Sequence, residues 1–120
     1  MKINIQTSVG ELLDKITILQ IKSEHSSSSF ITQELNDLIE IAKNHQVYLS
    51  SYLQKLKEVN QKLWKIEDDL RKLERTKDFS SHFIELARSV YRTNDERARI
   101  KKEINELTHS FYKEIKIHKI

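Results

Sequence analysis

The stretch LSSYLQKLKEVNQKLWKIEDDLRKL, residues 49–73, determines the fold class of this chain. Its apolar side chains recur every seven residues in two series, Leu49, Leu56, Leu63 and Leu70, and Tyr52, Val59, Ile66 and Leu73. A repeat kept over several heptads is typical of a long helix that packs lengthwise against another helix. We therefore predict a helix over residues 49–77 and a partner helix elsewhere in the chain.

The best partner for this helix follows it directly in the sequence. Residues 82–110 have helical apolar spacing, and Asn94 and Arg97 interrupt the apolar series at its middle. Residues 49–77 and 82–110 are equally long, and a turn at residues 78–81 joins them, so we expect an antiparallel helical hairpin. Each arm would be about 43 Å long at about 1.5 Å per residue.

The first helix is predicted to begin after Ser8. Glu11 follows three residues later, which is the spacing of a capping box. The helix is apolar on nearly all sides up to the serine run at residues 26–29, so it should be buried on more than one side.

A second helix is predicted to start near Phe30, and its apolar pattern weakens at residues 44–47. If it continued to residue 77 it would be about 72 Å long. A compact domain of this length has a radius of gyration of only about 14 Å. We therefore expect either a break at residues 44–47 or a projecting rod that meets another copy.

The two ends of the chain alternate polar and apolar residues, at 2–6 and at 113–119. This alternation is typical of strands. The sequence therefore predicts one domain over residues 1–120 of the all-α class, an elongated antiparallel hairpin or bundle of three to four helices. The termini are expected to add a small two-stranded ribbon.

The composition excludes several classes of protein. One glycine and no proline do not supply the turns of sandwiches, barrels or Rossmann units, and the absence of cysteine excludes disulfides and zinc–thiolate sites. A charged share of 32% argues against a membrane span and fits a cytoplasmic protein. The five histidines are scattered, so no metal site and no cofactor are expected.

Charge is unevenly distributed along the chain. The net charge is −2 over residues 1–70 and +5 over residues 71–120, and every arginine lies between Arg71 and Arg99. Acidic residues interrupt this basic span, whereas binding along a phosphate backbone needs a continuous basic stripe. Nucleic acid is therefore not an expected partner.

Three polar clusters lie where helical periodicity would place apolar side chains. They comprise Glu11, Asp14 and Lys15 on the first helix, Glu67, Asp68 and Arg71 beside Trp64, and Arg88, Tyr91, Asn94, Arg97 and Lys101 on the last helix. Polar groups at a helix interface often set register. If the clusters meet, they would instead form a binding or catalytic cleft for an anionic small molecule.

These two interpretations give two hypotheses for function. The first is a structural, self-assembling module, with a homodimer as the expected state; the second is the anionic-ligand cleft, and no complete catalytic set accompanies it. We predict that Arg97 pairs with a carboxylate of Glu67, Asp68, Glu11 or Asp14, because a desolvated guanidinium needs such a partner. Trp64 is predicted to be largely buried against the first helix near Leu12 or Ile16.

Three stretches together resemble a family of short bacterial and phage proteins classed as a domain of unknown function. They are SVGELLDKITILQIK at residues 8–22, LWKIEDDLRKLE at 63–74 and FIELARSVYRTNDERARIKKEINEL at 83–107. The tail EIKIHKI at 114–120 departs from the family pattern. The resemblance implies a mainly helical, soluble protein and implies no activity.

Overall fold

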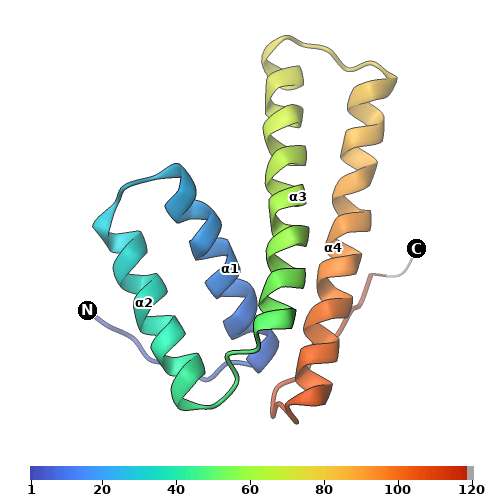
Figure 1. Ribbon diagram of the computed structural model, residues 1–120. Helices are drawn as coiled ribbons and strands as arrows, with labels where there is room; N and C mark the ends of the chain where they lie inside the picture. Colours follow the sequence, from blue (N-terminus) through green and yellow to red (C-terminus); the bar gives the residue numbers. More distant parts are fainter. Residues whose placement is uncertain (119–120) are drawn as a thin grey trace.

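The computed structural model describes residues 1–118, and this part of the chain forms four helices and no strand. They are α1 (Val9–His25), α2 (Ser29–Asn44), α3 (Ser50–Arg75) and α4 (Ser81–Leu107). The molecule measures 48 × 37 × 28 Å (Figure 1). The predicted all-α class is therefore confirmed. None of the described helices is long and apolar enough to cross a membrane.

Helix α1 is the centre of the packing, because it contacts each of the other three helices. Leu13 and Ile16 on α1 are completely buried. The core around them is completed by Ala42, Leu53, Leu56, Val59, Ile100 and Ile104. Being surrounded on several sides explains why the sequence of α1 is apolar nearly all round, as predicted.

Of the two alternatives left open for the second helix, the structure has the break. Helix α2 ends at Asn44, and Gln46 takes the left-handed conformation with φ of 58°. The Val47 N–H donates to the Ala42 carbonyl at 2.9 Å, which closes a Schellman motif. Lys77 and His109 have the same conformation after α3 and α4, with φ of 56° and 53°. The chain thus ends three helices in a glycine-type conformation without using glycine.

Helices α3 and α4 lie side by side and extend beyond α1 and α2 (Figure 1). We call their extended part, residues 67–92, the distal arm. The distal arm contains no fully buried residue. Its apolar interface residues Leu70, Leu73, Phe83, Leu86 and Val90 are only half-buried. This arm raises the radius of gyration to 16.1 Å, above the value of about 14 Å for a compact domain.

The expected terminal ribbon is wrong for the described residues, because residues 2–6 and 113–118 form no strand. The tail is held by α4 instead: Glu114 lies 3.3 Å from Lys101, and Lys116 lies 2.9 Å from Asp95. These ion pairs hold the tail along α4, and the tail keeps one contact with the other terminus, because the Tyr112 hydroxyl donates to Oε1 of Gln6 at 2.9 Å. Lys119, the last residue of the expected segment, lies outside the described residues.

Candidate functional site

The start of α1 is anchored on α4 by side chains that cap its free N–H groups. The Ser8 hydroxyl accepts from the Glu11 N–H at 3.1 Å, as predicted. From α4, the Asn105 side-chain carbonyl accepts from the Gly10 N–H at 2.7 Å, and just beyond α4 the Ser110 hydroxyl accepts from the Val9 N–H at 3.1 Å. The helix start thus has partners far away in the sequence, which fixes how α1 sits against α4.

Gly10, the one glycine of the chain, permits this close contact. A Cβ atom at residue 10 would lie 2.8 Å from the Lys101 carbonyl oxygen and 3.0 Å from Oδ1 of Asn105. The same amide of Asn105 has an enclosed Nδ2 without a hydrogen-bond partner in residues 1–118. Its orientation is set by the Gly10 N–H, which needs an acceptor.

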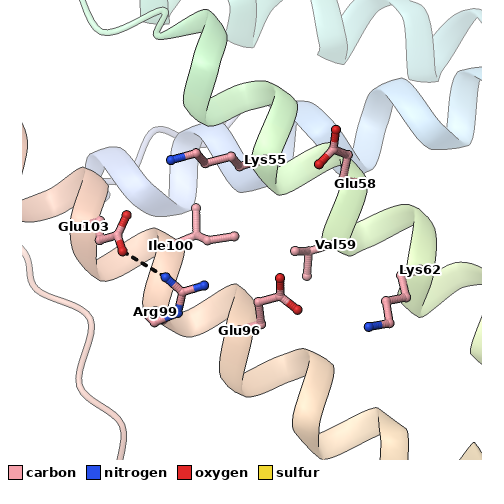
Figure 2. A pocket seen from close by; sticks show the side chains of 8 residues that line it. All are labelled: Lys55, Glu58, Val59, Lys62, Glu96, Arg99, Ile100 and Glu103. Atoms are coloured by element: carbon pink, nitrogen blue, oxygen red, sulfur yellow. Dashed lines mark hydrogen bonds and ion pairs between the residues drawn. The ribbon is translucent and has the colours of Figure 1, made fainter.

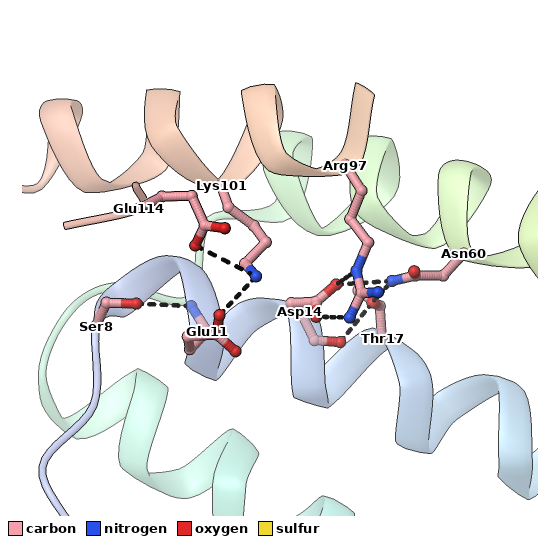
Figure 3. Close-up of polar contacts among 8 residues, drawn as sticks. All are labelled: Ser8, Glu11, Asp14, Thr17, Asn60, Arg97, Lys101 and Glu114. Atoms are coloured by element: carbon pink, nitrogen blue, oxygen red, sulfur yellow. Dashed lines mark hydrogen bonds and ion pairs between the residues drawn. The ribbon is translucent and has the colours of Figure 1, made fainter. Parts of the chain in front are cut away.

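A buried ion pair lies one turn further along α1 (Figure 3). Asp14 is 2% exposed; the Arg97 guanidinium donates to it from Nε at 2.9 Å and from Nη2 at 2.5 Å. Nδ2 of Asn60 donates to both Asp14 and Thr17 at 2.9 Å. The hydrogen bonds and charge of Asp14 raise the pKa of Arg97. The predicted pairing of Arg97 with a carboxylate from another segment is confirmed.

Lys101 forms a second charged group beside the first (Figure 3). It is 7% exposed, and its Nζ lies 2.5 Å from Glu11 and 3.3 Å from Glu114. Burial opposes the charged form, but the bond to Glu11 and the nearby carboxylates outweigh it, so the pKa of Lys101 is raised. The Glu11 carboxylate therefore pairs with Lys101. It accepts no hydrogen bond from the Ser8 N–H, so the second half of the expected capping box is not formed.

Four predicted site residues, Glu11, Asp14, Arg97 and Lys101, are brought together in these two groups. The others lie outside them: Lys15, Glu67, Asp68, Arg71, Arg88, Tyr91 and Asn94. Three exposed ion pairs account for several, namely Lys15 with Glu34 at 3.0 Å, Arg71 with Glu67 at 3.6 Å and Arg88 with Glu85 at 3.6 Å. Tyr91 lies under the Arg92 guanidinium, 5.8 Å from its carbon.

Two placements expected from periodicity are wrong. Asn94 is exposed, and its neighbour Thr93 takes the buried position, 2% exposed, with its hydroxyl donating to the Ser89 carbonyl. Trp64 is only half-buried and stacks on His25, with ring centroids 4.6 Å apart. Asn60 lies beside Asp14, so Trp64, one turn later on α3, reaches the far end of α1 rather than Leu12 or Ile16.

A groove of about 280 Å³ opens next to the Asp14–Arg97 pair, between α1, α3 and α4. We call it the Trp64 groove. Its lining is Ile18, Ile21, Asn60, Leu63, Trp64, Glu67, Asn94 and Arg97. Asn60 is not among the residues expected from the sequence, although it lies four residues before Trp64 on the polar stripe that continues to Glu67.

A second groove, of about 240 Å³, lies between α3 and α4 (Figure 2). Three cationic and three anionic side chains surround Val59 and Ile100 there: Lys55, Lys62, Arg99, Glu58, Glu96 and Glu103. Arg99 donates to Glu103 at 3.0 Å. The charges balance, which is typical of a solvated helix surface.

The model of a family described as "Family of unknown function (DUF6165)" matches residues 1–119. The chain belongs to this family. The match extends the resemblance seen in three stretches to almost the whole sequence, and it includes the tail that departed from the expected pattern. No curated protein and no solved structure matches the chain. Family membership thus supplies no activity, and the function has to be argued from the geometry.

Proposed function

We propose that this protein is a self-assembling structural module whose distal arm packs against the arm of a second copy. The observation that carries the proposal is the half-buried state of the arm's heptad residues, such as Leu70 and Leu86. In a complete coiled-coil bundle these positions are enclosed by neighbouring helices. Two antiparallel arms from two chains would form such a bundle of four helices. The exposed Phe79 and Ile84, at 51% and 55%, add apolar surface at the tip.

The charge pattern of the arm supports association with an identical arm. Residues 67–92 carry six Lys and Arg and six Asp and Glu, so two arms do not repel one another. The base of the α3 arm is acidic at residues 67–69, and its tip is mostly basic at residues 71–77. A two-fold axis that runs the two arms in opposite directions would place each basic tip beside the partner's acidic base.

The buried ion pair fits this structural role. Asp14, Arg97 and Asn60 satisfy one another, and Lys101 is satisfied by Glu11 and Glu114. Polar groups that bond mutually at an interface fix the register of helices. The alternative, a cleft in which these charges hold an anion, has less support because their charges are already paired. The single helical domain proposed here would act in the cytoplasm, where a chain without cysteine needs no oxidising environment.

Light scattering tests the proposal through the mass in solution. The wild-type chain should have twice its 14.3 kDa monomer mass at high concentration. Ile84→Lys, at the tip of the arm, should give the monomer mass and retain helical circular dichroism. Ile41→Lys is the matched control, because Ile41 is 43% exposed on α2, outside the arm, and should leave the dimer intact. A wild-type monomer at millimolar concentration would contradict self-assembly.

A further inference from the structure

The Trp64 groove has polar atoms that the protein itself does not use. Asn60 is 6% exposed. Its Nδ2 donates hydrogen bonds to Asp14 and Thr17, whereas its Oδ1 accepts no hydrogen bond from residues 1–118. That oxygen is not fully enclosed, and Asn60 is one of the residues that line the groove. A nearly buried amide with a free acceptor at a groove wall is a feature that a ligand hydroxyl can satisfy.

Donors lie around the same groove. Nη1 of Arg97 and Nε1 of Trp64 have no hydrogen-bond partner within residues 1–118, and neither atom is fully enclosed. The exposed amide of Asn94 adds one donor group and one acceptor. His25 stacks on Trp64 with an interplanar angle of 12°, which holds the indole ring in place. Residues with free donors and acceptors and one aromatic side chain thus line the same groove, which is the composition of a small-molecule site.

The electrostatics of the groove do not favour an ion. The positive charge of Arg97 is neutralised by Asp14, and the carboxylate of Glu67 has Arg71 at 3.6 Å. An ion entering the groove would lose water without finding an unpaired opposite charge. A neutral ligand whose polar groups each donate and accept could form hydrogen bonds with these unpartnered atoms, and it would lose less hydration free energy than an ion on entering the groove.

We propose that the Trp64 groove binds a neutral sugar of monosaccharide size. Its hydroxyls would donate to Asn60 Oδ1 and Glu67 and accept from Arg97 Nη1 and Asn94, and its apolar C–H face would lie on Trp64 and the neighbouring Ile18 and Leu63. The volume of about 280 Å³ admits one ring. The groove is separate from the tip of the distal arm, although Glu67 belongs both to the groove and to the acidic base of the arm. Asn94 lies outside the arm, so a variant at Asn94 tests the groove separately from self-assembly.

Trp64 is the only tryptophan and therefore reports on this groove alone. The wild-type chain is titrated with glucose, galactose, mannose, rhamnose and N-acetylglucosamine while indole emission is recorded, and saturation-transfer NMR checks each sugar. At least one sugar should give a saturable change with a dissociation constant on the order of 1 mM. Inorganic phosphate and ethanolamine, the anionic and cationic probes, should neither bind nor compete.

Two exposed positions allow variants that do not disturb the core. Asn94→Ala should weaken sugar binding by about 5-fold or more, the value of a lost hydrogen bond, with an unchanged melting temperature. Glu67→Gln keeps an acceptor oxygen and loses only the negative charge, so it should weaken binding by a smaller factor. Asn36→Ala and Glu40→Gln, on the exposed side of α2, are the matched controls and should bind as the wild type does. The proposal is overturned if no sugar gives a saturable response, if both groove variants keep full affinity, or if phosphate competes.

Discussion

Removing the carboxylate of Asp14 is the perturbation with the clearest expected effect. Its side chain is 3% exposed and accepts two hydrogen bonds from Arg97 and one from Asn60. Asp14→Ala leaves the guanidinium, whose side chain is 28% exposed, at the interface without a counter-ion. Breaking a buried pair in this way costs about 3–5 kcal/mol. Because water reaches part of Arg97, we expect the lower end, about 3 kcal/mol.

Urea unfolding followed by far-ultraviolet circular dichroism measures this change. For a chain of this length, about 3 kcal/mol corresponds to a fall of roughly 12 °C in melting temperature. Asp37→Ala is the control, because Asp37 is half-exposed and lies 3.8 Å from Lys2, and it should change stability by no more than about 0.5 kcal/mol. A loss of less than about 1 kcal/mol for Asp14→Ala, with an unchanged denaturant slope, would refute the reasoning.

The double variant Asp14→Leu with Arg97→Met separates two quantities: the net contribution of the ion pair to stability, and the destabilisation that follows when only one partner is removed. Both charges then leave the interface and apolar side chains replace them; methionine matches arginine in volume, leucine is larger than aspartate, and Asn60 keeps its hydrogen bond to Thr17. Replacing a whole buried pair by apolar residues is often neutral or stabilising. We therefore expect stability near or above that of the wild type, and a double-mutant cycle with a large coupling energy. Additive losses would show that the two residues do not act together.

Three further outcomes are expected. Gly10→Ala should lower the free energy of unfolding by about 1–3 kcal/mol, because the added methyl meets the Lys101 carbonyl, although alanine favours a helix by about 1 kcal/mol; a higher urea midpoint than that of the wild type would contradict this. Lys77→Gly should raise the melting temperature, since a non-glycine residue at φ of 56° is strained by about 1 kcal/mol; a decrease would be inconsistent with the left-handed conformation at this residue. The raised pKa of Lys101 means that its ion pairs stabilise the fold fully below its ordinary pKa of 10.5, and this contribution is lost as pH rises through the higher folded-state pKa. The stability difference between wild type and Lys101→Met should accordingly shrink in alkaline urea titrations, and a constant difference would argue against the pairing.

Helical periodicity predicted which residues of the candidate site lie near the interface, but it did not predict which side of each helix faces the neighbouring helix. It placed Arg97 opposite an acidic residue correctly, because a desolvated guanidinium has few alternatives to a carboxylate. It put Asn94 in the interface where Thr93 lies, since one residue rotates a helical position by about 100° and the crossing of α1 decides which side is covered. Trp64 contacts a different part of α1 from the one expected, and the reason is the position of α3 along the axis of α1. The packing of the two helices sets this position, and neither helix sequence sets it alone.

The sequence by itself determined that this chain is helical and that α1 is enclosed on several sides, and it offered a break at residues 44–47 as one of two alternatives. These properties depend on local spacing, on caps such as Ser8 and on the scarcity of glycine and proline, all of which act within a few residues. Only the tertiary structure decided which charges meet. Asn105 reaches Gly10 across 95 positions, Arg97 reaches Asp14 across 83, and residues 113–118 lie along α4 instead of forming a strand with residues 2–6. Such contacts depend on the orientation of whole helices, and many charged side chains of similar pattern compete for each partner until the packing selects one.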